Sequence, residues 1–544
     1  MRPLRWEPKR PVRLRSGQAT AAALQRPGHG NGSAAGVFSG VRWPDTNGMR
    51  IGHMLCKSLA YRALWCILSA STPVSQAQWE FAMRRARLRR GAKKVRRAAL
   101  ANPGTVFERV LSGQEVDEEC RWLGHEWRKR VFTPLVTLWT FLSQVLSADG
   151  SCRDAVARVL TFLGRTTGLT ASHDPSSYCT ARKRLPMALL PRLTRRVAGK
   201  LAGKVQARQL WRGHRVWLVD GTSVQMPDTA ANQAAYPQPS CQKPGCGFPV
   251  ARVVALFDLT TGAVWDAVLS SLSVGEVTLA RRLWPRLEPG DIVVGDSQFC
   301  TYADIALLRA GGVHAVFRVH VARKVDLRKA RRLGPGDWLV TWRKEVRPPR
   351  MPREVFEALA GSLCLRIVRF RCRVPGWRSE EITVVTTLLD PQQYSRQALA
   401  KLFHRRWDVE TDLAHLKTTM GMELLRTKSP DMVHRELWAH LLAYNLIRTL
   451  MWDAGTRRRV DPLRLSYKAT IQELFALWPF TATDMPRSDL DDFYDALIRA
   501  VGFHRLPERP HRHEPRVRKR RPKNYPVMGA SRSDCKKGQH GRTA

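Results

Sequence analysis

Three acidic residues, far apart in the chain, stand where carboxylates could do chemistry together. Asp220 follows the short apolar run VWLV, Asp296 follows DIVVG, and Glu410 lies in the helical stretch FHRRWDVETDLAHLK. Side chains at the carboxyl ends of neighbouring strands meet at one edge of an α/β sheet, and a helix crossing that edge can add a third carboxylate. We therefore predict that these three residues form one catalytic site.

Carboxylate oxygens are the ligands that Mg²⁺ or Mn²⁺ prefers in proteins. Two such ions about 4 Å apart can activate an attacking oxygen and stabilise the leaving oxygen of a phosphodiester. We predict that Asp220, Asp296 and Glu410 are the metal ligands, with two ions as cofactors. Each acid alone also has an ordinary explanation, since Asp-Gly and Gly-Asp-Ser are common turn sequences. The prediction depends on their shared arrangement.

The helical stretch around Glu410 carries basic residues on the same face. An α-helix turns about 100° per residue, which puts Arg406, Glu410 and Lys417 within about 40° of one another, with an aromatic ring beside them. Arg406 can bind a phosphate through two N–H groups, and Lys417 adds a point charge. An ordinary charged surface helix is the alternative. The predicted nucleic-acid contacts are Arg406, Lys417, Phe403 and Arg405.

The elements that would position these residues follow from the apolar pattern. Over 206–320, short apolar runs alternate with helical patterns, which predicts the first part of an α/β catalytic core. Residues 321–392 have strand character with Pro and Gly between the runs, so we expect a β-rich insertion. Residues 393–504 hold the rest of the core and C-terminal helices. Their first helix, capped by Ser395, is predicted to continue to about Met420.

The two ends of the chain have different compositions. Residues 1–50 are rich in Arg, Pro, Gly and Ala and show no sustained period. We therefore predict a disordered or weakly ordered extension over residues 1–75. Residues 76–205 read as several helices with basic faces, including one capped by the serines at 176–177, and suit a helical DNA-binding domain. The basic run RRARLRRGAKKVRR is either a DNA contact or a solvated helix face. Residues 505–544 form a basic, disordered tail.

The charge balance indicates the kind of partner. Lys and Arg total 91 and Asp and Glu total 46, which gives a formal net charge of +45. A surplus of this size favours a polyanion, with nucleic acid first and an anionic membrane second. No run of about 20 apolar residues exists, so we expect no membrane span. The 11 cysteines lack the spacing of a paired zinc site, which favours reduced thiols in a cytoplasm.

With these residues identified, the chain resembles a DDE transposase of the insertion sequence 4 family. The family signature is Tyr, two residues, Arg, three residues, Glu, six residues, Lys. Here Phe403 stands in the tyrosine position, and Arg406, Glu410 and Lys417 follow with the same spacing. The segments VDGT and VVGDSQF resemble the sequences around the first two acids, although Ser297 stands where many relatives carry arginine. The resemblance covers about residues 130–530.

The resemblance implies a ribonuclease H-like catalytic core with a β-rich insertion before the glutamate. It implies a transposase that binds the terminal inverted repeats of its insertion sequence, cleaves the double-stranded DNA ends and joins them to target DNA with two divalent metal ions. A homodimer on paired ends is also implied, in the cytoplasm and associated with the bacterial nucleoid when bound to DNA. Two alternatives remain: a metal-dependent DNA nuclease on the same core, and a catalytically silent DNA-binding remnant.

Overall fold

The computed structural model describes residues 107–128, 130–167, 171–320, 323, 325–372, 380–477, 487–507, 528–531 and 533–535. All of them belong to the unit Ala86–Ala544. The predicted extension over 1–75 and the basic run RRARLRRGAKKVRR lie outside the described residues, as does most of the predicted tail from 505. Within the described part, no helix is long and apolar enough to cross a membrane.

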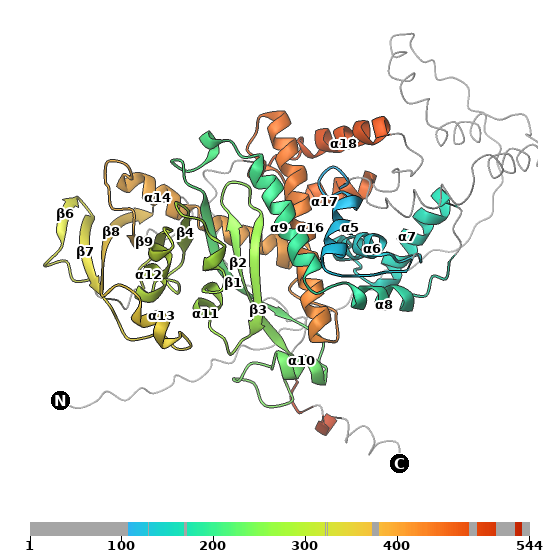
Figure 1. The fold of residues 1–544 in the computed structure, drawn as a ribbon, viewed down its shortest axis with the longest axis horizontal. Helices are drawn as coiled ribbons and strands as arrows, with labels where there is room; N and C mark the ends of the chain where they lie inside the picture. The colour runs from blue at the N-terminus through green and yellow to red at the C-terminus, as the bar shows by residue number, and fades with distance from the viewer. Residues whose placement is uncertain are drawn as a thin grey trace, which may run out of the picture. The chain divides into compact units, whose positions relative to one another are not determined.

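The described strands form one sheet of nine strands in the order β3-β2-β1-β4-β5-β9-β8-β7-β6 (Figure 1). β1, β4 and β5 run parallel to one another, and the remaining neighbours are antiparallel. The strands are β1 (Val216–Gln225), β2 (Val250–Asp258), β3 (Val264–Ser271), β4 (Ile292–Gly295), β5 (His314–Arg318), β6 (Arg331–Gly334), β7 (Asp337–Arg343), β8 (Ser362–Cys372) and β9 (Glu380–Thr386).

The helices lie on both faces of this sheet and beyond its first edge. They are α5 (Gly113–Trp122), α6 (Pro134–Leu146), α7 (Cys152–Thr167), α8 (Ser176–Arg184), α9 (Leu189–Gly203), α10 (Ala230–Ala235), α11 (Glu276–Ala280), α12 (Tyr302–Ala310), α13 (Arg353–Glu357), α14 (Arg396–His404), α15 (Trp407–Ala414), α16 (Pro430–Arg458), α17 (Tyr467–Leu477) and α18 (Arg487–Val501). Three short 3-10 turns, η1 (Ala207–Gln209), η2 (Trp284–Arg286) and η4 (Pro462–Arg464), connect some of them.

The strands expected between 321 and 392 are confirmed, and they continue the main sheet. β9 pairs antiparallel with β5, and β8, β7 and β6 follow outward from β9. The insertion therefore lengthens the sheet beyond its parallel centre and forms no separate sheet among the described residues. Figure 1 shows these strands at the end of the sheet farthest from α5 to α8.

Side chains of β1 alternate between two hydrophobic cores. Val216, Leu218 and Val224 join the core on the face covered by α15 and α16. Trp217 and Val219 join the core on the other face, with α11 and α12. Because side chains alternate along a strand, Asp220 belongs to the first face, beside α15. This parity decides which helix the predicted catalytic acid faces.

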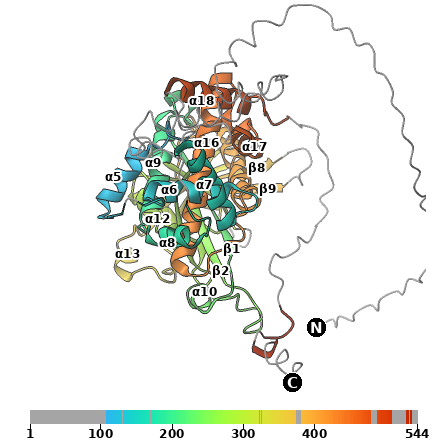
Figure 2. The same ribbon diagram turned by 90° about the vertical axis from the view of Figure 1, so that its right-hand side faces the viewer.

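Helix α16 is the central helix of the molecule (Figures 1 and 2). It packs against α6, α9, α17, α18 and β3, and it is buried almost all round, as expected for a helix inside a large core. Its Asn445 side chain bonds the first residue of β3 twice: Oδ1 accepts from Val264 N–H and Nδ2 donates to Val264 C=O, both at 2.8 Å. These bonds fix α16 to the sheet.

The helices α5 to α9 share this core with the sheet. Phe107 and Trp139 stack at 5.8 Å between ring centroids, and Leu193 on α9 belongs to the same buried cluster as β1 and α16. The structure confirms that several helices form between 107 and 205, including the one expected to begin at the serines 176–177. The serine cap expected for α8 is wrong, since Pro175 occupies the N-cap position and makes no side-chain bond. The boundary of a DNA-binding domain at 205 stays a prediction.

The long helix expected from Ser395 to Met420 is interrupted, so that part of the prediction is wrong. Its start is confirmed, because Ser395 Oγ accepts the Ala398 N–H at 3.3 Å. α14 then ends at 404, two turn residues follow, and α15 begins at 407. Arg405, in the turn, donates from Nη2 to the Leu259 carbonyl oxygen at 3.0 Å. This contact outside the helix accompanies the break, which the apolar period does not encode.

The end of this segment also departs from a regular α-helix. Residues His415–Thr419 form a single π-helical turn, η3, before Gly421 with φ +71°. A π turn holds more residues than an α turn and so rotates the side chains that follow. The angle predicted for Lys417 relative to Glu410, which assumed a regular α-helix, is therefore wrong.

Candidate active site

Asp220 and Asp296 come together through the register of two parallel strands. Val216 pairs with Ile292 and Leu218 pairs with Val294. The same register, continued by two residues, brings Asp220 opposite Asp296 just beyond the end of β4. Ile292 and Val294, like Val216 and Leu218, point to the core face covered by α15 and α16. Because side chains alternate along a strand, positions 220 and 296 belong to the same face. The sheet therefore presents two carboxylates, from strands 76 positions apart in sequence, on one face of its edge.

The electrostatic surroundings of Asp220 agree with this placement. Burial raises the pKa of its carboxyl to about 6, and the negative charge of Asp296 adds to the rise. The nearby Arg406 guanidinium and a hydrogen bond of 2.7 Å from the Gly221 N–H act in the opposite direction. Asp296 itself is half-buried and accepts the Gln298 N–H at 2.8 Å. Two like charges are thus held near each other in a partly dry site.

A third acid, which the sequence did not indicate, lies beside this pair. Glu276 is the first residue of α11, and its charge also raises the pKa of Asp220. Its carboxyl group sits against Gly221: a Cβ atom on that glycine would lie 2.5 Å from the Glu276 carboxyl carbon. Arg252 on β2 holds Glu276 in place, with 3.4 Å between Nε and Oε1. Glycine at 221 is therefore required for the approach of this acid.

Glu410 occupies the helix that faces Asp220, but an arginine holds its carboxylate. Arg406 Nη2 lies 3.0 Å from Glu410 Oε1, the i,i+4 contact that the helical spacing predicts. The Arg406 side chain is 14% exposed and the Glu410 side chain 51% exposed. Arg406 also lies 5.0 Å from the centroid of the Trp407 ring. Arg406 therefore pairs with the predicted third acid and also lowers the pKa of Asp220.

The buried side of α15 is fastened to α16 by an ion pair. Asp412 accepts a hydrogen bond from Arg448 Nη2, and both side chains are less than 10% exposed. Arg448 Nε donates to the Tyr444 hydroxyl oxygen at 2.8 Å, and that hydroxyl donates to the Gly262 carbonyl oxygen at 2.9 Å. This chain of bonds runs from the helix of Glu410 through α16 to the β2–β3 turn. It fixes the position of α15 relative to the sheet.

The other three predicted nucleic-acid contacts, Phe403, Arg405 and Lys417, have different surroundings in the structure. Phe403 is 1% exposed and packs edge to face against Phe370 at 6.3 Å, so its ring supports the core and does not face a ligand. Arg405 pairs with Asp408 at 2.9 Å. Lys417 lies in the π turn and forms no ion pair with any described residue. The structure therefore brings Arg406 to the acids and leaves Lys417 without a contact to them.

The fit of a divalent cation can be tested on these side chains. No three His, Cys, Asp or Glu side chains lie close enough to form a metal-binding group within the ranges that the structure describes. Asp220 and Asp296 do fit a hard cation, because they are neighbouring carboxylates whose mutual repulsion a positive charge would relieve. Glu410 can join them only after it leaves Arg406.

Two acids near this site have weak or no signals in the sequence. Glu276 gives a weak local signal, as an acid directly after a glycine at the start of a helix. Asp412 lies about 200° around the helix from Glu410, on the side that also buries Val409 and Leu413. A buried acid needs a partner. The partner of Asp412 is Arg448, 36 residues later in the chain, and only the tertiary fold brings the two together.

Comparisons with known proteins find similarity to transposases. Residues 211–446 match the family model described as a transposase DDE domain. The transposase InsG for insertion sequence element IS4 of Escherichia coli (strain K12) is 23% identical over 403 residues, which cover 74% of this chain and 88% of that protein. Among solved structures, a piggyBac transposase synaptic complex with hairpin DNA aligns with a TM-score of 0.37 and 11% identity, over 75% of this chain and 86% of that one.

The family match spans the strands that carry Asp220 and Asp296, the insertion, and the helix that carries Glu410. The curated relative extends the similarity to 74% of this chain. Residues 211–446 therefore match a transposase DDE domain, and the chain is similar over most of its length to a transposase of insertion sequence element IS4.

Proposed function

We propose that this transposase binds the terminal inverted repeats of its insertion sequence, cleaves the DNA ends and joins them to target DNA. In this proposal Asp220, Asp296 and Glu410 are the catalytic residues and metal ligands. The observation that supports it is the parallel register of β1 and β4, in which Leu218 pairs with Val294. Continued by two residues, this register would bring Asp220 opposite Asp296. Two acids at one sheet edge, with a third on the helix above, match the needs of phosphodiester transfer.

The proposed core is ribonuclease H-like. Support comes from the strand order β3-β2-β1-β4-β5, in which the first three strands are antiparallel and the last two run parallel to β1. We keep the proposed division into a helical DNA-binding domain at 76–205, core parts at 206–320 and 393–504, and the insertion at 321–392.

When bound, two Mg²⁺ or Mn²⁺ ions would activate the attacking oxygen and stabilise the leaving oxygen. The chain's own residues have separate tasks. Asp220 and Asp296 supply negative oxygens on a rigid sheet edge, so their positions need little rearrangement. Arg406 has a guanidinium that can bind a phosphate with two N–H groups. The Asp412–Arg448 pair holds the helix on which Glu410 and Arg406 lie.

Arg406 connects DNA binding to the completion of the site. Its guanidinium now neutralises Glu410. An arriving phosphate competes for the same N–H groups and frees the Glu410 carboxylate to turn toward the two aspartates. The acids therefore assemble when the substrate is present, which limits metal-dependent cleavage without DNA in position.

The net charge of +45 supports double-stranded DNA as the partner. A homodimer on paired DNA ends, in a bacterial cytoplasm, completes the proposal. The test is to incubate purified protein with Mg²⁺ and DNA that carries the flanks of its own element, and to map the product ends. We expect cut ends joined to target DNA, and no product with Asp296→Ala. Cut ends without joined product would indicate the nuclease alternative instead.

A further inference from the structure

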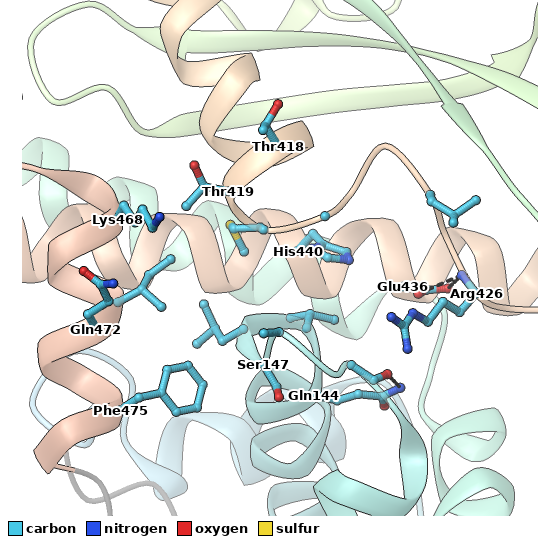
Figure 3. Close-up of a pocket in the computed structure, with 18 of the residues that line it drawn as sticks. Gln144, Ser147, Thr418, Thr419, Arg426, Glu436, His440, Lys468, Gln472 and Phe475 are labelled. Atoms are coloured by element: carbon cyan, nitrogen blue, oxygen red, sulfur yellow. Dashed lines mark hydrogen bonds between the residues drawn. The ribbon is translucent and has the colours of Figure 1, made fainter. Parts of the chain in front are cut away.

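A separate cavity of about 780 Å³ lies between α6 on one side and α16 and α17 on the other (Figure 3). Residues from α6, the π turn η3, α16 and α17 line it. Its volume falls within the range of about 300–1,000 Å³ that is typical of small-molecule sites. None of the proposed catalytic acids lines it, so it is distinct from the active site.

The floor of this cavity contains a buried histidine whose ring is not fully satisfied. His440 on α16 is 4% exposed, and its Nδ1 atom has no hydrogen-bond partner among the described residues. Figure 3 shows His440 in the middle of the labelled lining residues. Burial and the charge of Arg426 lower the pKa of His440 to about 3. The ring is therefore neutral at physiological pH and offers one donor and one acceptor.

The floor also contains a carboxylate, which restricts what can bind there. Glu436 is 5% exposed, and its oxygens accept the backbone N–H groups of Arg426 and Thr427 at 3.0 Å. A phosphate placed beside this carboxylate would be repelled. The floor therefore suits a neutral group with hydrogen-bonding edges.

The rim has the opposite character, because it carries exposed cations. Lys468 on α17 and the side chain of Arg426 have no carboxylate partner among the described residues. The Arg426 guanidinium lies over Gly150, where a Cβ atom would be 3.2 Å from its Cζ. Unpaired cations at an entrance suit a phosphate group. Phe475 lines the same cavity and supplies an aromatic ring.

We propose that this cavity binds a nucleotide, with the phosphate at Lys468 and Arg426 and the base between His440 and Phe475. A nucleobase is flat and neutral and carries both donors and acceptors, which matches the floor, while its phosphate matches the rim. Aromatic stacking and cations are the usual combination for such a unit. The nucleotide is either free in solution or part of a DNA strand.

The position of the cavity gives this site a functional connection. Thr418 and Thr419, in the π turn that ends the helix of Glu410, line one wall. A ligand that contacts these residues therefore contacts the turn that directly follows α15, the helix that bears the proposed catalytic glutamate. The DNA form of this proposal rests on the proposed function, whereas the free-nucleotide form does not.

The test for a free nucleotide uses isothermal titration calorimetry. The full-length protein is titrated with each of the four deoxynucleoside monophosphates and with the matching nucleosides. We expect a monophosphate to bind and its nucleoside to bind about tenfold more weakly, since the nucleoside lacks the charged contact. Lys468→Ala should lower the affinity for the monophosphate by a similar factor. The matched control is Lys329→Ala, which removes the same charge from an exposed lysine outside the cavity. This variant should bind the monophosphate with unchanged affinity.

The test for the DNA source places the photo-crosslinker benzoylphenylalanine at Gln472 on the rim, or at Lys329 as control. We expect a crosslink to DNA from position 472 that exceeds the control. Either monophosphate binding that depends on Lys468 or this crosslink supports the site and identifies the source. No monophosphate binding together with no excess crosslink, or binding unchanged by Lys468→Ala with no excess crosslink, overturns it. A protein that passes this test but cuts no DNA would lose only the proposed function.

Discussion

The guanidinium of Arg406 holds the carboxylate of Glu410, with 3.0 Å between Nη2 and Oε1. The same arginine lowers the pKa of Asp220, whereas Asp296 raises it. Arg406 thus faces acids from two distant parts of the chain. Its release from Glu410 is the movement that the proposed mechanism requires.

Removal of this arginine should affect chemistry more than binding. Arg406→Ala frees Glu410 but removes the phosphate contact, so we expect the cleavage rate to fall at least tenfold. General DNA affinity should fall only slightly, because it is spread over many basic residues and depends steeply on salt. Cleavage kinetics and fluorescence anisotropy on end-sequence and random DNA measure the two effects. Equal losses of affinity on both DNAs, with no additional loss of rate, would refute a local role.

The contact between Gly221 and Glu276 predicts a sensitive position next to Asp220. In Gly221→Ala the new methyl group would meet the Glu276 carboxyl carbon at 2.5 Å, so Glu276 must move away from the aspartate pair. We expect slower DNA cleavage with the fold intact, as judged by circular dichroism. Gly275→Ala is the control, since a Cβ there meets no atom within 4 Å. Equal activity of the two variants would mean that the position of Glu276 is unimportant.

The buried ion pair between α15 and α16 should dominate the stability of the site. Asp412→Asn leaves Arg448 buried and only partly compensated, which we expect to lower the free energy of unfolding by about 3–5 kcal/mol. The comparison is Glu357→Gln, which breaks an exposed i,i+4 pair with Arg353 and should cost at most about 1 kcal/mol. Urea unfolding of both variants measures the difference. Similar small losses would contradict the anchoring role.

The buried histidine of the cavity predicts a loss of stability in acid. His440 has a pKa of about 3 in the folded chain and an ordinary value near 6.5 when unfolded. As the pH falls below about 6.5 the unfolded chain takes up the proton first, so the free energy of unfolding decreases by up to about 1.4 kcal/mol per pH unit. This contribution is complete above pH 6.5 and is lost toward pH 3.

Replacement of His440 isolates its contribution to the pH dependence of the free energy of unfolding. His440→Gln cannot take up the proton, so urea unfolding between pH 7 and pH 5 should show a shallower pH dependence than the wild type. The absolute stability at pH 7 can change through packing and is not the readout. An unchanged slope would show that His440 stays protonated, or is exposed, in the folded chain.

The sequence contained most of the strand pattern and the positions of the paired aspartates, because short apolar runs that end in an acid are local signals. The Ser395 cap and the i,i+4 pair of Arg406 with Glu410 are local in the same sense. The break after α14 was not predictable, since it accompanies a contact between Arg405 and the Leu259 carbonyl group. The partner of Asp412 likewise depends on how α16 packs.

The most direct test of the account is anomalous diffraction from crystals of the full chain with end-sequence DNA and Mn²⁺. We predict manganese between the carboxylates of Asp220 and Asp296, with Glu410 turned away from Arg406 and bound to the same metal site. Manganese bound elsewhere, or Glu410 still held by Arg406 in a complex that cuts DNA, would contradict it.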